Sequence, residues 1–134
     1  MPDLLSDHFQ FHQKALALRA ERQQILASNM ANADTPHYKA RDIDFRQSLA
    51  HALGASSDAT LALAATHSGH RVGSLASGAI PLLYRLPRQD SIDGNTVELD
   101  TERALAADNA LRYEAGLLAI NSKIKDLLAA VHAQ

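Results

Sequence analysis

The chain has 134 residues, a length that suits one domain better than two. Although 46% of its residues are hydrophobic, only 4% are aromatic and many of the others are alanine, so the core that it can bury alone is thin. A formal net charge of −2 gives no basic face for nucleic acid, and the absence of cysteine excludes disulfides and thiolate metal sites.

The start of the chain, residues 1–8, lacks the basic segment and apolar stretch of a cleaved signal peptide. No apolar run in the sequence approaches the roughly 20 residues of a membrane-spanning helix. By themselves, the composition and the start therefore indicate a soluble, cytoplasmic chain.

Residues 1–35 are predicted to form a long amphipathic helix with a frayed start and with Ser6 or Asp7 as its N-cap. Two seams of residues at spacings of four and three run side by side along it. Together they make a stripe broad enough to pack against more than one neighbour. The first seam comprises Phe11, Ala15, Leu18, Arg22, Ile25 and Asn29, and the second comprises Leu5, Phe9, His12, Leu16, Gln23, Leu26 and Met30.

The helix is expected to end at Thr35-Pro36, because proline disfavours α geometry at the preceding residue and lacks a backbone donor. Asn32 and Asp34 can satisfy the freed backbone groups with their short polar side chains. Residues 38–45 carry no helical period and are predicted to be extended. This stretch is therefore a helix exit with a fixed change of direction.

The middle of the chain, residues 36–96, is predicted to be extended or irregular. Phe45, Leu49 and Leu53 are four residues apart, which indicates a short helix ended by Gly54. The segment after this glycine is rich in small residues and has no sustained period.

Residues 54–80 are predicted to be a loop, with at most a helical turn around residues 60–65. Residues 80–86 are bounded by Pro81, near the start of the range, and by Pro87, just after it, and form a short extended candidate. Because proline cannot donate to a sheet ladder, this segment is an edge strand at best.

Residues 97–134 are predicted to form a second long helix, after a turn at Asp93-Gly94 and with Thr96 or Asp100 as its cap. Acidic residues at its start complement the positive end of the helix dipole. Small residues come early in its seam, where a neighbour can approach closely, and large ones come later. The seam comprises Leu99, Ala106, Ala110, Tyr113, Leu117, Ile120, Ile124, Leu127 and Val131, and Arg103 occupies the position between Leu99 and Ala106.

The sequence thus predicts one mainly α-helical domain over residues 1–134. Its long N- and C-terminal helices are expected to pack as an antiparallel, coiled-coil-like pair, with an irregular or short extended middle region. Stripes wider than one partner helix can cover suggest that the chain also packs against copies or partners.

Two blocks of sequence resemble bacterial flagellar rod and hook proteins. The first is Asn29-x-x-Asn32-x-x-Thr35-Pro36-x-Tyr38, and its extension to Phe45 is similar to the proximal rod family FlgB in particular. The second runs from Asp93 to Glu98 and continues in Asn109 and Arg112-Tyr113. The family usually has glycine where this chain has His37, and glycine adopts a positive-φ turn more readily than histidine does.

The resemblance implies a structural subunit of the flagellar basal-body rod that assembles helically into the proximal part of a torque-transmitting drive shaft. It implies terminal helices joined in a core that lines a tube. The implied partners are copies of the chain, other rod proteins, the rod-to-MS-ring adaptor and, in transit, the flagellar type III export gate. The implied location is the rod crossing the periplasm, reached without a cleaved signal peptide.

Three groups of residues are candidates for these roles. One sets the helix exit, one supplies assembly contacts on the helices, and one carries a Phe-x-x-x-apolar pattern of the kind thought to dock on the export gate. Packing on the helices is the simpler role of this last pair. The groups are Asn29, Asn32, Thr35, Pro36 and Tyr38; Leu18, Ile25, Tyr113, Leu117, Ile120, Ile124 and Leu127; and Phe45 and Leu49.

No catalytic, cofactor-binding or metal-binding residue is predicted. His8 and His12 have a spacing that suits a metal but lack an obvious third ligand, so surface or packing roles are favoured. Asp42 and Asp44 lie beside basic residues and are expected in solvated or interprotomer ion pairs. The sequence contains no nucleophile elbow or phosphate loop.

Two other classes of protein remain open. A small cytoplasmic helical adaptor or chaperone-like binding module explains the amphipathic helices but not the Thr-Pro-x-Tyr exit. A distal rod or hook-family member would tend to be longer, with outer domains for which 134 residues leave little room.

Overall fold

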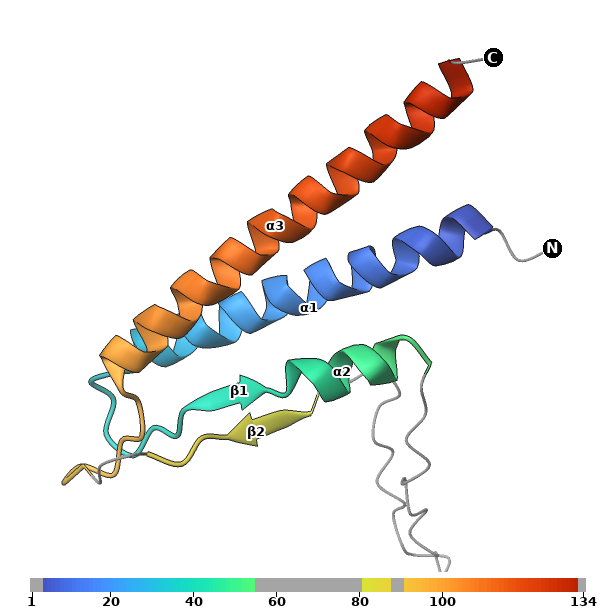
Figure 1. Cartoon of the computed structure of the whole chain (residues 1–134). Helices are drawn as coiled ribbons and strands as arrows, with labels where there is room; N and C mark the ends of the chain where they lie inside the picture. The colour runs from blue at the N-terminus through green and yellow to red at the C-terminus, as the bar shows by residue number, and fades with distance from the viewer. Residues whose placement is uncertain (1–3, 55–80, 88–90, 133–134) are drawn as a thin grey trace, which may run out of the picture.

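The computed structural model describes residues 4–54, 81–87 and 91–132. Two long helices, α1 (Leu4–Ala31) and α3 (Leu99–His132), run antiparallel, as Figure 1 shows. They lie close together where α1 ends and α3 begins, and they spread apart towards the chain termini. The predicted mainly helical fold, with paired terminal helices and a short extended middle, is confirmed.

The ends of α1 differ from the prediction. The helix begins at Leu4, so Ser6 and Asp7 lie inside it and neither is its N-cap. An acidic residue such as Asp7 is also favourable within a first turn, because it complements the positive end of the helix dipole. At the other end, the helix stops at Ala31, before Thr35-Pro36. There the Nδ2 group of Asn32 donates to the carbonyl oxygen of Ser28 at 2.8 Å. The proline therefore fixes the path after the helix rather than its last residue.

The middle region contains two strands, β1 (Arg41–Ile43) and β2 (Leu82–Tyr84), and a short helix, α2 (Phe45–Ala52). Asp44 caps α2 by accepting from the backbone N–H of Gln47 at 3.1 Å. The predicted extended segments and the short helix are confirmed. Apart from Gly54, the predicted loop of residues 54–80, including its turn at residues 60–65, lies outside the described residues. The strands form an antiparallel pair with Arg41 opposite Tyr84, Asp42 opposite Leu83 and Ile43 opposite Leu82.

The start of α3 also corrects a prediction. Asp100 lies inside the first turn, and the side chain of Thr96 accepts from the backbone N–H of Ala40 at 2.8 Å instead of capping the helix. Glu98 precedes the helix, and its carbonyl accepts from the N–H of Glu102 at 2.9 Å. Thr96 is thus the right kind of residue for a cap, but its hydroxyl binds the backbone that leads into β1.

The core at the junction of these elements is small and unusually polar. Among the described residues, buried polar side chains are as prominent as buried apolar ones, so hydrogen bonds and ion pairs must help to fix the geometry. The buried apolar residues are Leu18, Leu26, Ala40, Ile43 and Ala106, and the buried polar ones are Asn29, Ser48, Asn95, Thr96, Glu102 and Asn109.

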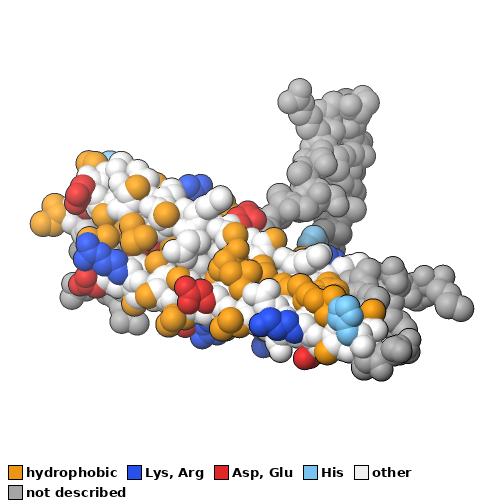
Figure 2. All heavy atoms as spheres, turned by 90° about the horizontal axis from the view of Figure 1, so that it is seen from above, with side chains coloured by type: hydrophobic (Ala, Val, Ile, Leu, Met, Phe, Trp, Pro, Cys, Tyr) orange, Lys and Arg blue, Asp and Glu red, His pale blue; other side chains and the backbone are white. Residues whose placement is uncertain are grey.

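Beyond this core, α1 and α3 approach closely at Gly116. A Cβ atom added there would lie 2.9 Å from Cδ2 of Leu16, so glycine permits the contact. None of the described residues of α3 after Asn109 is buried, and large apolar side chains remain exposed along the second half of the helix. Figure 2 shows hydrophobic side chains gathered in a band along one face of the molecule. In the described part of the chain, no helix is apolar enough over sufficient length to span a membrane.

Candidate assembly site at the helix exit

The two sequence blocks that resemble rod proteins meet in space. We call this region the junction: residues 29–45 together with residues 93–102. Backbone hydrogen bonds join its two parts, from His37 N to Asp93 O and from Thr96 N to Tyr38 O, each at 3.0 Å. Lys39 Nζ donates to Gly94 O at 2.6 Å. Segments more than 50 residues apart in the sequence thus form one structural unit.

Asn95 holds the end of α1 in place. Its buried Nδ2 group lies within hydrogen-bond distance of three carbonyl oxygens, those of Asn32 at 3.0 Å, Ala33 at 2.7 Å and Thr35 at 3.0 Å. These three carbonyls belong to the turn that follows α1, and the amide of Asn95 supplies them with a donor from a distant segment. Sequence reasoning misses the role of Asn95, although it predicts the Asp93-Gly94 turn beside it.

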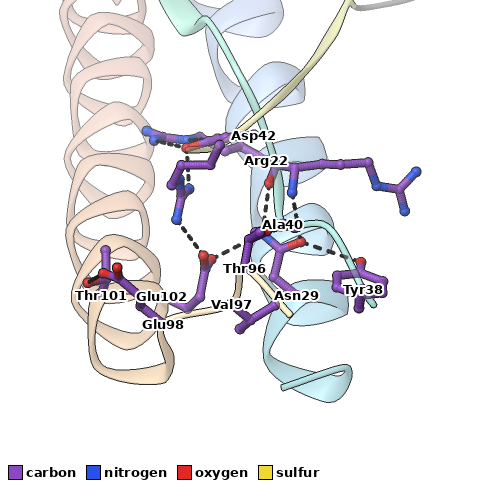
Figure 3. A network of polar contacts seen from close by, with 12 residues as sticks. Arg22, Asn29, Tyr38, Ala40, Asp42, Thr96, Val97, Glu98, Thr101 and Glu102 are labelled. Atoms are coloured by element: carbon purple, nitrogen blue, oxygen red, sulfur yellow. Dashed lines mark hydrogen bonds and ion pairs between the residues drawn. The ribbon is translucent and has the colours of Figure 1, made fainter. Parts of the chain in front are cut away.

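Asn29 joins α1 to the first strand and to α3, as Figure 3 shows. Its side chain is fully buried. The Nδ2 group donates to the carbonyl of Arg41 at 2.7 Å and to Oε2 of Glu102 at 3.1 Å. The Oδ1 atom accepts from the N–H of Arg41 at 3.1 Å and from the Tyr38 hydroxyl at 3.4 Å. Both hydrogens and both lone pairs of the amide therefore have partners.

A network of ion pairs surrounds this amide. Arg22 donates from Nε and Nη2 to the two oxygens of Asp42, each at 2.8 Å, which is a bidentate pair. Arg85 donates from Nη2 to Asp42 at 2.7 Å and from Nη1 to Oε1 of the fully buried Glu102. The network connects α1, the first strand, the segment after the second strand and α3.

This arrangement corrects the expectation that Asp42 takes part in solvated or interprotomer ion pairs. The first strand runs against α1, so Asp42 meets Arg22 within the chain. Burial raises the pKa of this carboxyl, but hydrogen bonds from Arg22, the N–H of Ile43 and Arg85, together with the charge of Arg22, outweigh it and lower the pKa below its ordinary value. The same contact, chiefly through its hydrogen bond, raises the pKa of Arg22.

Acid should therefore weaken the junction. Because the pKa of Asp42 is lowered in the folded chain, its stabilising contribution is complete above the unfolded value of about 4 and is lost as the pH falls below it. At pH 7, Asp42→Asn should lower the free energy of unfolding by about 3 kcal/mol, since it leaves two arginines short of a partner. Urea unfolding of wild type and variant at pH 7, 5 and 3 measures this. A difference in the free energy of unfolding that stays constant down to pH 3 would refute the stabilising role of the ionised Asp42.

The comparisons with known proteins decide the family. The family described as flagella basal body rod protein matches residues 9–39, which span most of α1 and the helix exit. The flagellar basal body rod protein FlgB of Salmonella typhimurium is 47% identical over 131 residues, 96% of this chain and 95% of that protein. FlgB of Escherichia coli is 46% identical over the same shares, and FlgB of Cereibacter sphaeroides is 41% identical over 128 residues, 96% of each chain. The chain belongs to the FlgB family of flagellar basal body rod proteins.

At position 37 this chain has histidine where the FlgB family usually has glycine. Its φ is nevertheless +61°, so the histidine adopts the left-handed backbone that glycine would take more readily. The turn is held by its hydrogen bond to Asp93 and by close packing on Gly94, where an added Cβ atom would lie 2.9 Å from Nδ1 of His37. Gly94 itself has φ +71°. With these contacts, the chain keeps the left-handed turn at position 37 although the residue there is histidine.

The residues predicted to set the helix exit divide into two groups. Asn29 and Tyr38 belong to the buried network around Glu102. Thr35 donates from its hydroxyl to Oδ1 of Asn32 at 3.2 Å, and Pro36 is exposed. All five thus lie in the junction, but their effect on neighbouring subunits stays a prediction.

The predicted assembly residues also separate by exposure. Leu18 is buried inside the chain, and Ile25, Tyr113 and Ile120 are half-buried. The exposed members, with 38–42% of their surface accessible, are Leu117, Ile124 and Leu127. The exposed members of this predicted set therefore all lie on the second half of α3.

Phe45 and Leu49, the predicted export-gate pair, are half-buried on α2, which packs against α1. The guanidinium of Arg19 lies 4.3 Å from the centre of the Phe45 ring, a cation–π contact. In the folded chain Phe45 therefore contacts α1, and Leu49 lies half-buried on the same short helix. The described residues contain no group of three or more His, Asp or Glu side chains that could hold a metal ion.

Proposed function

We propose that the chain is a structural subunit of the flagellar rod that assembles helically into the proximal part of the drive shaft and transmits torque. Its similarity to FlgB rod proteins over nearly its full length is the observation that carries this proposal. A small helical adaptor is disfavoured, because it gives no reason for this similarity or for the interlocked junction.

The mechanism is packing rather than catalysis. The junction holds the end of α1 against the start of α3, and its carboxylates Asp42 and Glu102 are paired within the chain with Arg22 and Arg85. The diverging halves of the helices then present apolar side chains to neighbouring subunits. Burial of one Leu or Ile side chain contributes about 1.5–3 kcal/mol, so a few such contacts per subunit can hold an assembly together.

The proposed partners are copies of the chain, other rod proteins and the rod-to-MS-ring adaptor, in the rod where it crosses the periplasm. We propose that the subunit gets there through the flagellar type III export gate and not by a cleaved signal peptide. Because Phe45 contacts Arg19 of α1 and Leu49 is half-buried once the chain folds, docking of this pair on the gate would precede folding.

Complementation tests this proposal. Cells of the source strain that lack the chain should not swim, and the wild-type chain should restore swimming. The double variant Phe45→Ala and Leu49→Ala should reduce both swimming and the amount of chain outside the cytoplasm, whereas Gln47→Ala, at an exposed position of the same helix, should do neither. Normal swimming of the deletion strain would refute the rod function, and normal export of the double variant would refute gate docking by this pair.

A further inference from the structure

A groove of about 450 Å³ lies between α1 and α3. Three alanines, Ala20, Ala27 and Ala110, form part of its wall, so small side chains leave the space open. Asn109, which is buried, also lines it. The Nδ2 group of Asn109 donates to the carbonyl of Arg19 at 2.9 Å, but its Oδ1 atom has no hydrogen-bond partner among the described residues. These features favour an apolar occupant that also carries a polar donor.

A row of side chains on α3 begins at this groove and continues past it. Residues at alternating spacings of four and three lie on one face of a helix. The first two members line the groove, and the three large apolar members beyond it are 40–53% exposed. We call this row the outer seam: Ala110, Glu114, Leu117, Asn121, Ile124 and Leu128. The groove and an uncovered apolar stripe thus share one side of α3.

Building on the proposed function, we propose that the groove receives the outer seam of a second copy, through residues 117–128 of its α3. Large aliphatic side chains of one copy would fill the space that the alanines leave in the other. Asn121, which is exposed among them, would supply a donor for Oδ1 of Asn109 after a small shift of the side chains at the groove floor.

Charge complementarity sets the direction of the incoming helix. When two α3 helices run parallel with Asn121 of one copy opposite Asn109 of the other, Lys125 of the first comes one turn further, beside Glu114 of the second. Glu114 lines the groove and is exposed, and so is Lys125. An antiparallel approach would place Lys125 away from this carboxylate.

The contact joins two different surfaces, the groove of one copy and the stripe of the next. Each pair therefore leaves one groove and one stripe free, so further copies can add beyond the dimer, and the rotation between copies decides whether they form an open helix or a ring. A seam-to-seam contact, by contrast, would use the same surface on both copies and end at a dimer.

Cysteine cross-linking tests the contact, because the chain has no cysteine of its own. Glu114→Cys combined with Lys125→Cys should form disulfides between copies in isolated basal bodies and give a ladder beyond the dimer. The matched control keeps Glu114→Cys but moves the second cysteine to Ala130, an exposed position on the opposite side of α3. Proximity should make the yield from the first pair about tenfold higher. Gln24→Cys with Lys125→Cys is a second pair across the same contact, for use if the first fails to assemble.

Equal yields from the test and control pairs in swimming cells would overturn the contact and leave the rod function intact. Dimers from Asn121→Cys alone, with no higher species, would show that two outer seams meet and would also overturn it. If the proposed rod function itself were wrong, the wild-type chain would be missing from isolated basal bodies. That result is distinguishable from a failure of the contact, in which the chain is present but the cross-link is not.

Discussion

Asn29→Asp is expected to destabilise the folded chain by about 3–5 kcal/mol at pH 7, although the two side chains have nearly the same shape. The substitution removes the donor that reaches Arg41 and Glu102, and it places a second carboxylate 3.1 Å from the fully buried carboxylate of Glu102. Two like charges at that distance in a buried site cannot both stay ionised without a large cost. Thermal and urea unfolding of the purified chain measure the loss.

Two further variants make this prediction specific. Asn121→Asp is the same chemical change at an exposed position, and it should alter the free energy of unfolding by no more than about 0.5 kcal/mol. Adding Glu102→Gln to Asn29→Asp removes the second carboxylate, so it should recover part of the lost stability and reveal coupling between the two positions. Additive effects of these two substitutions would contradict the buried contact.

Ile124→Asp is expected to abolish swimming while export of the chain continues. Ile124 is 42% exposed, so the free energy of unfolding should change by no more than about 1 kcal/mol. At an assembly contact, however, the same substitution would bury an unpaired carboxylate against apolar side chains, which is strongly unfavourable. Swimming assays and immunoblots of the cytoplasmic and external fractions measure the two effects.

Ala130→Asp introduces the same charge on the other side of the helix, where the side chain is also exposed, and should leave swimming intact. If Ile124→Asp cells swim like wild type, the second half of α3 is not an assembly surface. If both variants stop swimming, charge on this helix interferes in some way other than through the proposed face.

Much of the fold can be predicted from local pattern. The heptad spacing of Leu18 and Ile25 predicts the first long helix, and that of Leu117 and Ile124 predicts the second. The proline at the helix exit predicts the turn after the first helix. The spacing of Phe45 and Leu49 likewise predicts α2. These features depend on residues close together in the sequence, where helical period and backbone preference act directly.

The features that sequence reasoning misses depend on contacts between distant segments. Nothing near Asp42 indicates that Arg85 lies beside it, and Glu102 has the features of an ordinary acidic residue at a helix start. The residue type of Thr96 suits a helix cap, whereas tertiary structure places its hydroxyl at the N–H of Ala40. The resemblance of both blocks to one family is the signal that they lie together, and it does not specify which side chains meet.

The rod assignment is tested most directly by whether the chain is built into basal bodies. Basal bodies purified from the source strain should contain the chain by mass spectrometry, and a reconstruction of their rod should accommodate the paired helices and junction of Figure 1 in its proximal part. Basal bodies that are complete without the chain, with all of it in the cytosolic fraction, would contradict the assignment and favour the adaptor.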